Sequence, residues 1–183
     1  MKTAADAMSP PPESETLCCE IHDSSLGLVL ISTSARGVCA ILFGDDRAVL
    51  QDEFRRRFPK ATLASPTKAS QSLTVGVLAL VEAQTVKTPP LDLRGTDFQK
   101  RIWRALLEIP AGSTVSYKEL AYRAGTPTAV RAAAGACAAN PLALLVPCHR
   151  VVRHDGGLSG YRWGVARKRT LLEREGVLTG GAK

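Results

Sequence analysis

Residues Ser116–Ala139 read SYKELAYRAGTPTAVRAAAGACAA, and their pattern indicates how the second half of the chain folds. Its first four residues, Ser116–Glu119, match a capping box, so we expect a helix that begins there and runs through Ala124. A turn should follow at Gly125–Pro127. A second helix is then expected over Thr128–Ala139, because proline suits the first turn of a helix. Two short helices around a glycine-containing turn predict a helix-turn-helix.

The second of these helices consists almost entirely of alanine and glycine, and Arg131 is its only charged residue. Small side chains allow a helix to approach another surface closely. One interpretation is a close-packed core helix with a solvated arginine. The other is a helix that lies against DNA with Arg131 at the base stack, and the helix alone does not decide between them.

The neighbouring segments extend this pattern in both directions. Upstream, Thr96–Gln99 is a second capping box, and the apolar spacing after it predicts a helix that ends at Ile109–Gly112. Downstream, Asn140-Pro141 should end the small-residue helix, and Leu142–Val146 is predicted to be a buried strand stopped by Pro147.

The first half predicts a small α+β domain. Leu26–Ile31 and Gly37–Phe43 are apolar and partly β-branched, as expected of strands. Two helices are expected, one from Val49 to Arg57 and one around Leu73–Val81. We therefore divide the chain into a disordered tail (1–15), an α+β domain (16–90), a mostly helical domain (91–177) and a C-terminal tail (178–183).

The charge of the chain is concentrated in its second half. Of the 24 Lys+Arg and 17 Asp+Glu residues, 10 and 11 precede Thr96, which gives −1, whereas 14 and 6 follow from Thr96 onward, which gives +8. Such an imbalance indicates either a polyanionic partner such as nucleic acid or simply a basic solvated surface. No apolar run approaches the roughly 20 residues of a membrane span. Five cysteines without CxxC spacing and no export signal predict reduced thiols in the cytoplasm.

The tetrapeptide Pro147-Cys148-His149-Arg150 carries the strongest chemical signal. A cysteine attacks as the thiolate, so a base or a positive charge must lower the pKa of the thiol. Adjacent residues of an extended chain point to opposite faces, so Cys148 and His149 would need a bridging water or a sharp turn to interact. The residues alone leave open a buried cysteine beside a surface histidine. Several carboxylates could orient the imidazole: Glu108, Glu119, Asp155, Glu173 and Glu175.

The segment Pro147–Val152 resembles the active-site signature of the O6-alkylguanine-DNA alkyltransferases, also called methylated-DNA–protein-cysteine methyltransferases. The similarity covers roughly Leu91–Gly176 and includes several further motifs in the order of the family: Thr114–Tyr117, Arg131-Ala132, Asn140-Pro141, Leu158–Gly160 and Leu171–Gly176. It is strongest to the C-terminal part of the bacterial adaptive-response regulator. The first half resembles the ribonuclease H-like N-terminal domain of the family only loosely.

The resemblance implies a set of catalytic roles. Cys148 would accept the alkyl group, His149 would deprotonate it through a water, and Glu175 would hold His149 in the required tautomer. Tyr117 would contact the flipped base and donate a proton toward it. Asn140 would brace the turn between the recognition helix and the active-site strand.

The resemblance also implies binding roles. The Val151 carbonyl and Ser159 would hydrogen-bond the guanine, and Gly160 would shape its pocket. Arg131 would fill the gap in the duplex. The remaining residues expected to contact DNA are Thr128, Ala129 and Arg150.

The implied function is DNA repair without a cofactor or metal. A monomer would transfer a methyl or alkyl group irreversibly, once per molecule, from O6 of guanine or O4 of thymine to Cys148, after flipping the nucleotide out of double-stranded DNA. The regulator's four-cysteine zinc domain and activating segment are not in this sequence, so we expect neither phosphotriester repair nor gene activation. Two rival hypotheses are a lesion-binding module without catalysis and a cysteine hydrolase unrelated to DNA.

Overall fold

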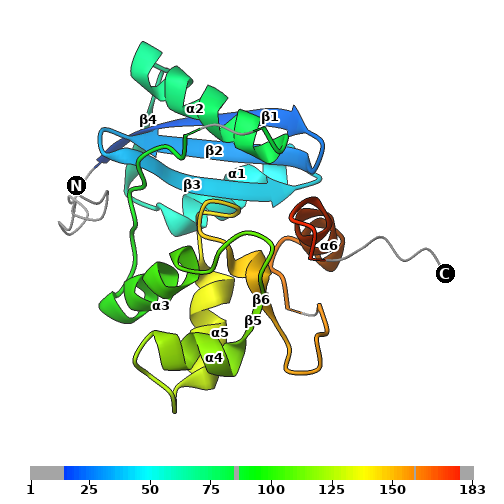
Figure 1. Ribbon diagram of the computed structural model, residues 1–183. Coiled ribbons are helices and arrows are strands. Elements are labelled where there is room, and N and C mark those ends of the chain that lie inside the picture. The colour runs from blue at the N-terminus through cyan, green and yellow to red at the C-terminus, as the bar shows by residue number, and fades with distance from the viewer. Residues whose placement is uncertain (1–14, 85–86, 159, 178–183) are drawn as a thin grey trace. The chain divides into compact units, whose positions relative to one another are not determined.

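The computed structural model describes residues 15–84, 87–158 and 160–177 (Figure 1). The chain forms two compact units, Met1–Arg94 and Gly95–Lys183. The division falls later than the boundary predicted after residue 90, because Leu91 bridges to Val38 and the Asp92 N–H donates to the Val38 carbonyl. The predicted tails lie outside the described residues, except that Glu15 already belongs to the first strand.

The first unit contains a four-stranded mixed sheet in the order β3-β2-β1-β4, in which β1, β2 and β3 are antiparallel and β4 runs parallel to β1. The strands are β1 (Glu15–Ser24), β2 (Gly27–Ser34), β3 (Gly37–Gly44) and β4 (Ala61–Ala64). The two predicted strands are confirmed as β2 and β3. The other two were not predicted, because β1 carries charged residues and cysteines on its partly exposed face and β4 has only four residues.

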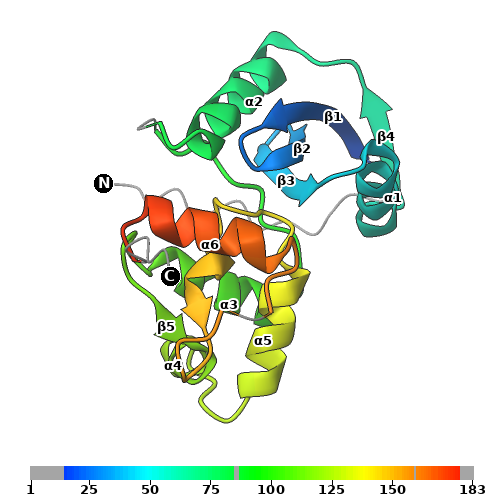
Figure 2. The same ribbon diagram turned by 90° about the vertical axis from the view of Figure 1, so that its right-hand side faces the viewer.

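The helices α1 (Arg47–Arg57) and α2 (Lys68–Val81) confirm both predicted helices of this half and cover opposite faces of the sheet (Figure 2). The face of α1 that contacts the sheet buries Leu50 and Phe54. The Thr74 hydroxyl of α2 donates to the Glu20 carboxylate on the other face of β1. The α+β class expected for this half is therefore confirmed.

The second unit is mainly helical, with α3 (Asp97–Leu107), α4 (Tyr117–Arg123), α5 (Val130–Ala139), a 3₁₀ helix η1 (Cys148–Arg150) and α6 (Val165–Arg174). Both halves of the capping box of α3 are formed, as predicted. The indole N–H of Trp103 donates to the Ala136 carbonyl at 2.9 Å, which joins α3 to α5. The two-residue strands β5 (Val115–Ser116) and β6 (Val151–Val152) pair in parallel.

Two predictions in this unit are wrong. The small-residue helix begins at Val130 rather than Thr128, because residues 126–129 form a turn closed by the Ala129 N–H and the Thr126 carbonyl. Leu142–Val146 is buried but is a turn rather than a strand, and Leu144 has a φ of 69°. The cause is Asn140, whose side chain bonds the backbone at both ends of the segment and replaces sheet pairing.

No helix within the described ranges is both long and apolar enough to cross a membrane.

Candidate active site

Cys148 opens η1 and is 5% exposed, so its thiol is inside the second unit but near its surface. The side-chain amide of Asn140 donates to Sγ of Cys148 at 3.2 Å and to the Val146 carbonyl at 2.9 Å. Its Oδ1 accepts from the Leu142 N–H at 2.9 Å. Asn140 is completely buried, and these hydrogen bonds hold the turn before Cys148 and reach its sulfur directly.

His149 is completely buried and its Nε2 lies 2.9 Å from Oε1 of Glu175. Arg150 bonds the same carboxylate through Nε and Nη2, and its Nη1 donates to the Ile109 carbonyl at 2.5 Å. Glu175 follows directly after α6, so the end of one helix orders two consecutive residues of η1. From the sequence, Cys148 and His149 needed a bridging water or a sharp turn to interact. The 3₁₀ helix η1 is such a turn.

The protonation states follow from these contacts. Burial alone would raise the pKa of Glu175, but its hydrogen bonds with His149 and Arg150 and the nearby charge of Arg150 outweigh that effect and lower the pKa to about 2, so this carboxylate is ionised and only accepts. Nε2 of His149 must therefore carry the proton that Glu175 accepts. Burial lowers the pKa of His149, so the ring is neutral at neutral pH. Nδ1 is then the basic nitrogen, and it is buried without a hydrogen-bond partner in the described part of the chain.

Burial raises the pKa of Cys148 to about 11, although the Asn140 amide and the charge of Lys168 both lower it. The resting thiol is therefore protonated at neutral pH. A base must take its proton before it can attack, and neutral His149, the next residue in the chain, is suited to that task.

Tyr117 opens α4, directly after β5. The pairing of β5 with β6 places Ser116 opposite Val152, which brings the start of α4 to the end of the active-site segment. Burial and the two nearby thiols, Cys137 and Cys148, raise the pKa of Tyr117 to about 12, so the phenol keeps its proton and can donate it. Gly160 lies beside it, because a Cβ at that position would be 3.3 Å from the Tyr117 hydroxyl. Ser159 lies outside the described residues.

The Val151 carbonyl, expected to bind guanine, accepts a hydrogen bond from Nζ of Lys168 at 2.5 Å. Sequence reasoning did not assign a role to Lys168. A signal was available, since Lys168 stands three and four residues before Leu171 and Leu172, on the buried stripe of α6.

The residues predicted to contact DNA divide into two groups. Arg131 and Thr128 are exposed and Ala129 is half-buried, all at or just before the N-terminal end of α5. Arg150 differs, because its guanidinium is committed to Glu175 and the Ile109 carbonyl. The exposed stripe of α5 after Arg131 has only small side chains, Ala132, Gly135 and Ala138.

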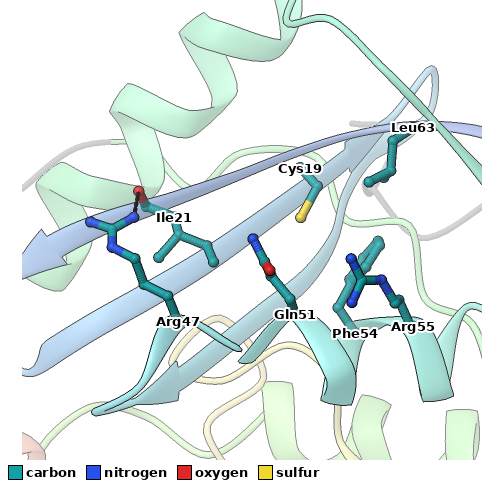
Figure 3. A pocket seen from close by; sticks show the side chains of 7 residues that line it. All are labelled: Cys19, Ile21, Arg47, Gln51, Phe54, Arg55 and Leu63. Carbon is teal, nitrogen blue, oxygen red and sulfur yellow. Dashed lines mark hydrogen bonds between the residues drawn. The ribbon is translucent and has the colours of Figure 1, made fainter. Parts of the chain in front are cut away.

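The other described cysteines are poorer candidates for an acceptor. Cys19 lines a cavity of about 210 Å³ between β1, β4 and α1 (Figure 3), where burial raises its pKa to about 12 and no histidine is among the lining residues. The polar side chains at this cavity are Arg47, Gln51 and Arg55, and Arg47 donates to the Ile21 carbonyl. Burial also raises the pKa of Cys39 and of Cys137, and neither has a histidine next to it in the chain, as Cys148 has. A group of three or more possible metal ligands does not occur among the described residues.

Most of the second unit matches a known protein family. Residues 97–177 match the family model described as "6-O-methylguanine DNA methyltransferase, DNA binding domain". The chain is 54% identical over 156 residues to the bifunctional transcriptional activator/DNA repair enzyme Ada of Escherichia coli, which covers 85% of this chain but only 44% of Ada. It therefore spans less than half the length of that relative.

Two further similarities cover most of both proteins. The inducible methylated-DNA–protein-cysteine methyltransferase of Bacillus subtilis is 36% identical over 79% of this chain and 82% of its own length. The structure of Mycobacterium tuberculosis OGT in complex with DNA aligns with a TM-score of 0.70 and 33% identity, over 87% of this chain and 92% of that one. The chain belongs to the methylated-DNA–protein-cysteine methyltransferase family.

Proposed function

We propose that this protein repairs double-stranded DNA by moving a methyl or other alkyl group from O6 of guanine, and from O4 of thymine, to Sγ of Cys148. The observation that carries the proposal is the buried thiol bonded to Asn140 and adjacent in the chain to the His149–Glu175 pair. The names of the relatives support the same chemistry, since the Bacillus subtilis protein is called a methylated-DNA–protein-cysteine methyltransferase.

The reaction is a displacement at the alkyl carbon. Nδ1 of His149 takes the thiol proton through a water, and ionised Glu175 stabilises the resulting imidazolium. The Cys148 thiolate then forms the new S–C bond while the C–O bond breaks, and the electron pair of the C–O bond passes to the oxygen of the base. The Tyr117 hydroxyl donates a proton toward the base as this charge develops. The thioether product has no easy leaving group, so each molecule reacts once.

The target oxygen lies inside the base stack, so the nucleotide must leave the duplex, at a cost of a few kcal/mol. We infer that α4, the following turn and α5 act as a helix-turn-helix, with α5 against the DNA. Thr128 and Ala129 contact the DNA at the start of α5, and exposed Arg131 fills the place of the flipped nucleotide. Support comes from the small exposed side chains of α5 and from the similar OGT structure, which was determined in complex with DNA.

The first unit is, in our proposal, ribonuclease H-like. Its order β3-β2-β1-β4, with three antiparallel strands followed by a strand parallel to β1, supports this assignment. We further propose that the protein is a cytoplasmic monomer, which fits a DNA partner and five cysteines without a disulfide.

Titration with DNA that carries a radiolabelled O6-methylguanine tests the function. Label should move to protein until one methyl group has been transferred per protein molecule, and then stop. Cys148→Ser should transfer none but still shift the DNA in a gel, because the DNA-facing helix is untouched. Continued turnover past one equivalent, or transfer by Cys148→Ser, contradicts the proposal.

A further inference from the structure

Lys168 is the one lysine among the largest fully buried side chains of the described residues, with no measurable exposure. Its Nζ donates to the Val151 carbonyl at 2.5 Å. None of the ion pairs found between the described residues includes it. A buried ammonium without a carboxylate is costly, so a lysine kept only for packing is poorly explained here.

The position of this ammonium relative to the acceptor follows from the backbone. The Val151 N–H donates to the Cys148 carbonyl, so Val151 closes the 3₁₀ turn that Cys148 opens. The carbonyl that Lys168 fixes is thus one turn from the nucleophile. Glu175, which caps the C-terminal end of the same helix about two turns after Lys168, holds His149 and Arg150. Lys168 in α6 and Glu175 just after it therefore hold three consecutive residues of the active-site segment, the carboxylate at His149 and Arg150 and the cation at Val151.

We propose that Lys168 is a positioning residue of the alkyl-transfer site, whose ammonium fixes the Val151 carbonyl and stabilises the Cys148 thiolate. This inference rests on the proposed function, because the anion that would balance the buried Lys168 ammonium is the Cys148 thiolate that attacks the alkyl group. When the Cys148 thiol loses its proton, the negative charge forms inside the unit, where an opposite charge lowers a thiol pKa more than it does in water.

The other described titratable groups around the thiol do not balance the negative charge of the Cys148 thiolate. Cys137 and Tyr117 have raised pKa values, and burial raises that of Tyr161 well above its ordinary value, so all three are neutral. The positive charge of Arg150 is paired with Glu175, and His149 is neutral. The charge of Arg167 lowers the pKa of Tyr161, and its guanidinium donates to the Trp163 carbonyl. Consistently, Lys168 lowers the pKa of Cys148, while burial lowers the pKa of Lys168 itself.

The test measures thiolate formation without DNA. The full chain is treated with iodoacetamide, a neutral reagent, at several pH values from 7 to 9. Tandem mass spectrometry follows the alkylation of Cys148 separately from Cys137. Half-exposed Cys18 of the first unit serves as the internal control for the reagent.

Three variants separate charge from packing. Lys168→Met removes the charge and keeps the length, Lys168→Gln also removes the charge but keeps an N–H donor, and Lys168→Arg keeps the charge in a bulkier side chain. Both neutral variants should slow alkylation of Cys148 by about tenfold or more at each pH, which corresponds to one pKa unit, and leave Cys18 unchanged. Lys168→Arg should stay within about threefold of the parent, in line with its retained charge.

The proposal is overturned if either neutral variant, shown to be folded by circular dichroism, alkylates at Cys148 as fast as the parent. It is also overturned if Cys148 is alkylated as slowly in Lys168→Arg as in the neutral variants, since the charge would then have no effect and Lys168 would act through packing alone. A failure of the proposed function would look different. The parent would then take no methyl group from DNA, while the order of alkylation rates would be unaffected.

Discussion

Asn140 shows how one side chain sets both structure and reactivity. Its oxygen and its nitrogen bond the backbone on either side of the turn that precedes Cys148, and the same amide reaches the sulfur. The turn and the orientation of the thiol therefore depend on each other. From the sequence, Asn140 was a helix terminator and, by resemblance, a brace, whereas its contact with the thiol required three-dimensional structure.

Asn140→Ala should lower the free energy of unfolding by about 2–4 kcal/mol, because it leaves the Leu142 N–H buried without its partner and removes one of the two hydrogen bonds to the Val146 carbonyl. Urea denaturation measures this change. Asn140→Asp is the matched variant. It keeps the acceptor for Leu142 but places a carboxylate beside the thiol, so alkylation of Cys148 at pH 8 should be slower than in the parent. Equal alkylation rates would contradict the contact between Asn140 and Cys148.

Glu175 makes the stability of the fold depend on pH. Its pKa falls from 4.5 to about 2 on folding, so the stability that it contributes is present above pH 4.5 and is lost as the pH falls toward 2. The lowered pKa of His149 acts in the same direction, since the unfolded chain takes up the proton first as the pH falls below 6.5.

Glu175→Gln should therefore cost about 2–3 kcal/mol at pH 7 and flatten the loss of stability between pH 4.5 and 2. Thermal unfolding across this pH range measures both effects. Exposed Glu173, two residues earlier, provides the control, and Glu173→Gln should unfold like the parent. A Glu175→Gln profile as steep as that of the parent would show that this carboxylate is not the group responsible.

Among the secondary-structure elements, most helices could be predicted because their N-caps are made by residues close together in the sequence. Thr96 and Gln99 form the reciprocal cap of α3, and the Ser116 hydroxyl accepts from the Glu119 N–H at the start of α4. Long-range signals were weaker. The pairing of β5 with β6 involves two residues from each strand, and nothing local distinguishes Val115 as a partner of Val151.

The residues of the candidate site likewise divide into those that local sequence predicted and those that depended on long-range contacts. From the residues alone Glu175 was one of five carboxylates that could orient His149, and the resemblance selected it. The fold shows why it is suited, since α6 ends beside η1. Lys168 remained unassigned, although its spacing before Leu171 and Leu172 placed it on the apolar face of α6, because a lysine is rarely fully buried.

Helix α5 supplies a prediction about contact with DNA. A Cβ on Gly135 would meet nothing within 4 Å, so the fold itself tolerates a larger side chain there. If α5 lies against DNA, Gly135→Leu should weaken binding to duplex DNA by about tenfold or more, which corresponds to roughly 1.4 kcal/mol. Gel shifts and urea denaturation together separate binding from folding.

The matched control lies on α2 of the other unit. Gly76 is likewise helical, and a Cβ there would also meet nothing within 4 Å, so Gly76→Leu adds the same bulk away from the proposed interface. It should bind DNA like the parent. Equal binding by both variants would remove α5 from the interface.

At the scale of the whole molecule, charge and chemistry coincide in one unit. Gly95–Lys183 contains Cys148 and carries the excess of positive charge, 14 basic against 6 acidic residues, whereas the first unit is close to neutral. A protein that holds DNA through phosphates releases counterions when it binds.

The affinity for undamaged duplex DNA should therefore fall as salt rises, with a log–log slope of roughly −0.9 for each phosphate contacted. Fluorescence anisotropy between low and physiological salt measures the slope. A hydrolase unrelated to DNA would show no such dependence, so a flat profile would favour that alternative.

The role proposed for Arg131 connects DNA binding with alkyl transfer. Arg131→Ala should slow methyl transfer from duplex DNA by far more than it slows the reaction with free O6-benzylguanine, which needs no extrusion from a stack. Single-turnover rates on the two substrates give the comparison. Similar losses on both would refute a role in holding the nucleotide outside the duplex.

The most direct measurement is the mass of the peptide that contains Cys148 after incubation with excess duplex DNA carrying O6-methylguanine. This peptide should gain one methyl group on the sulfur of Cys148, guanine should be restored in the DNA, and the other cysteines should stay unmodified: Cys18, Cys19, Cys39 and Cys137. An unmodified Cys148 after exhaustive incubation of folded protein, or a methyl group on any other cysteine, would contradict the proposed transfer to Cys148.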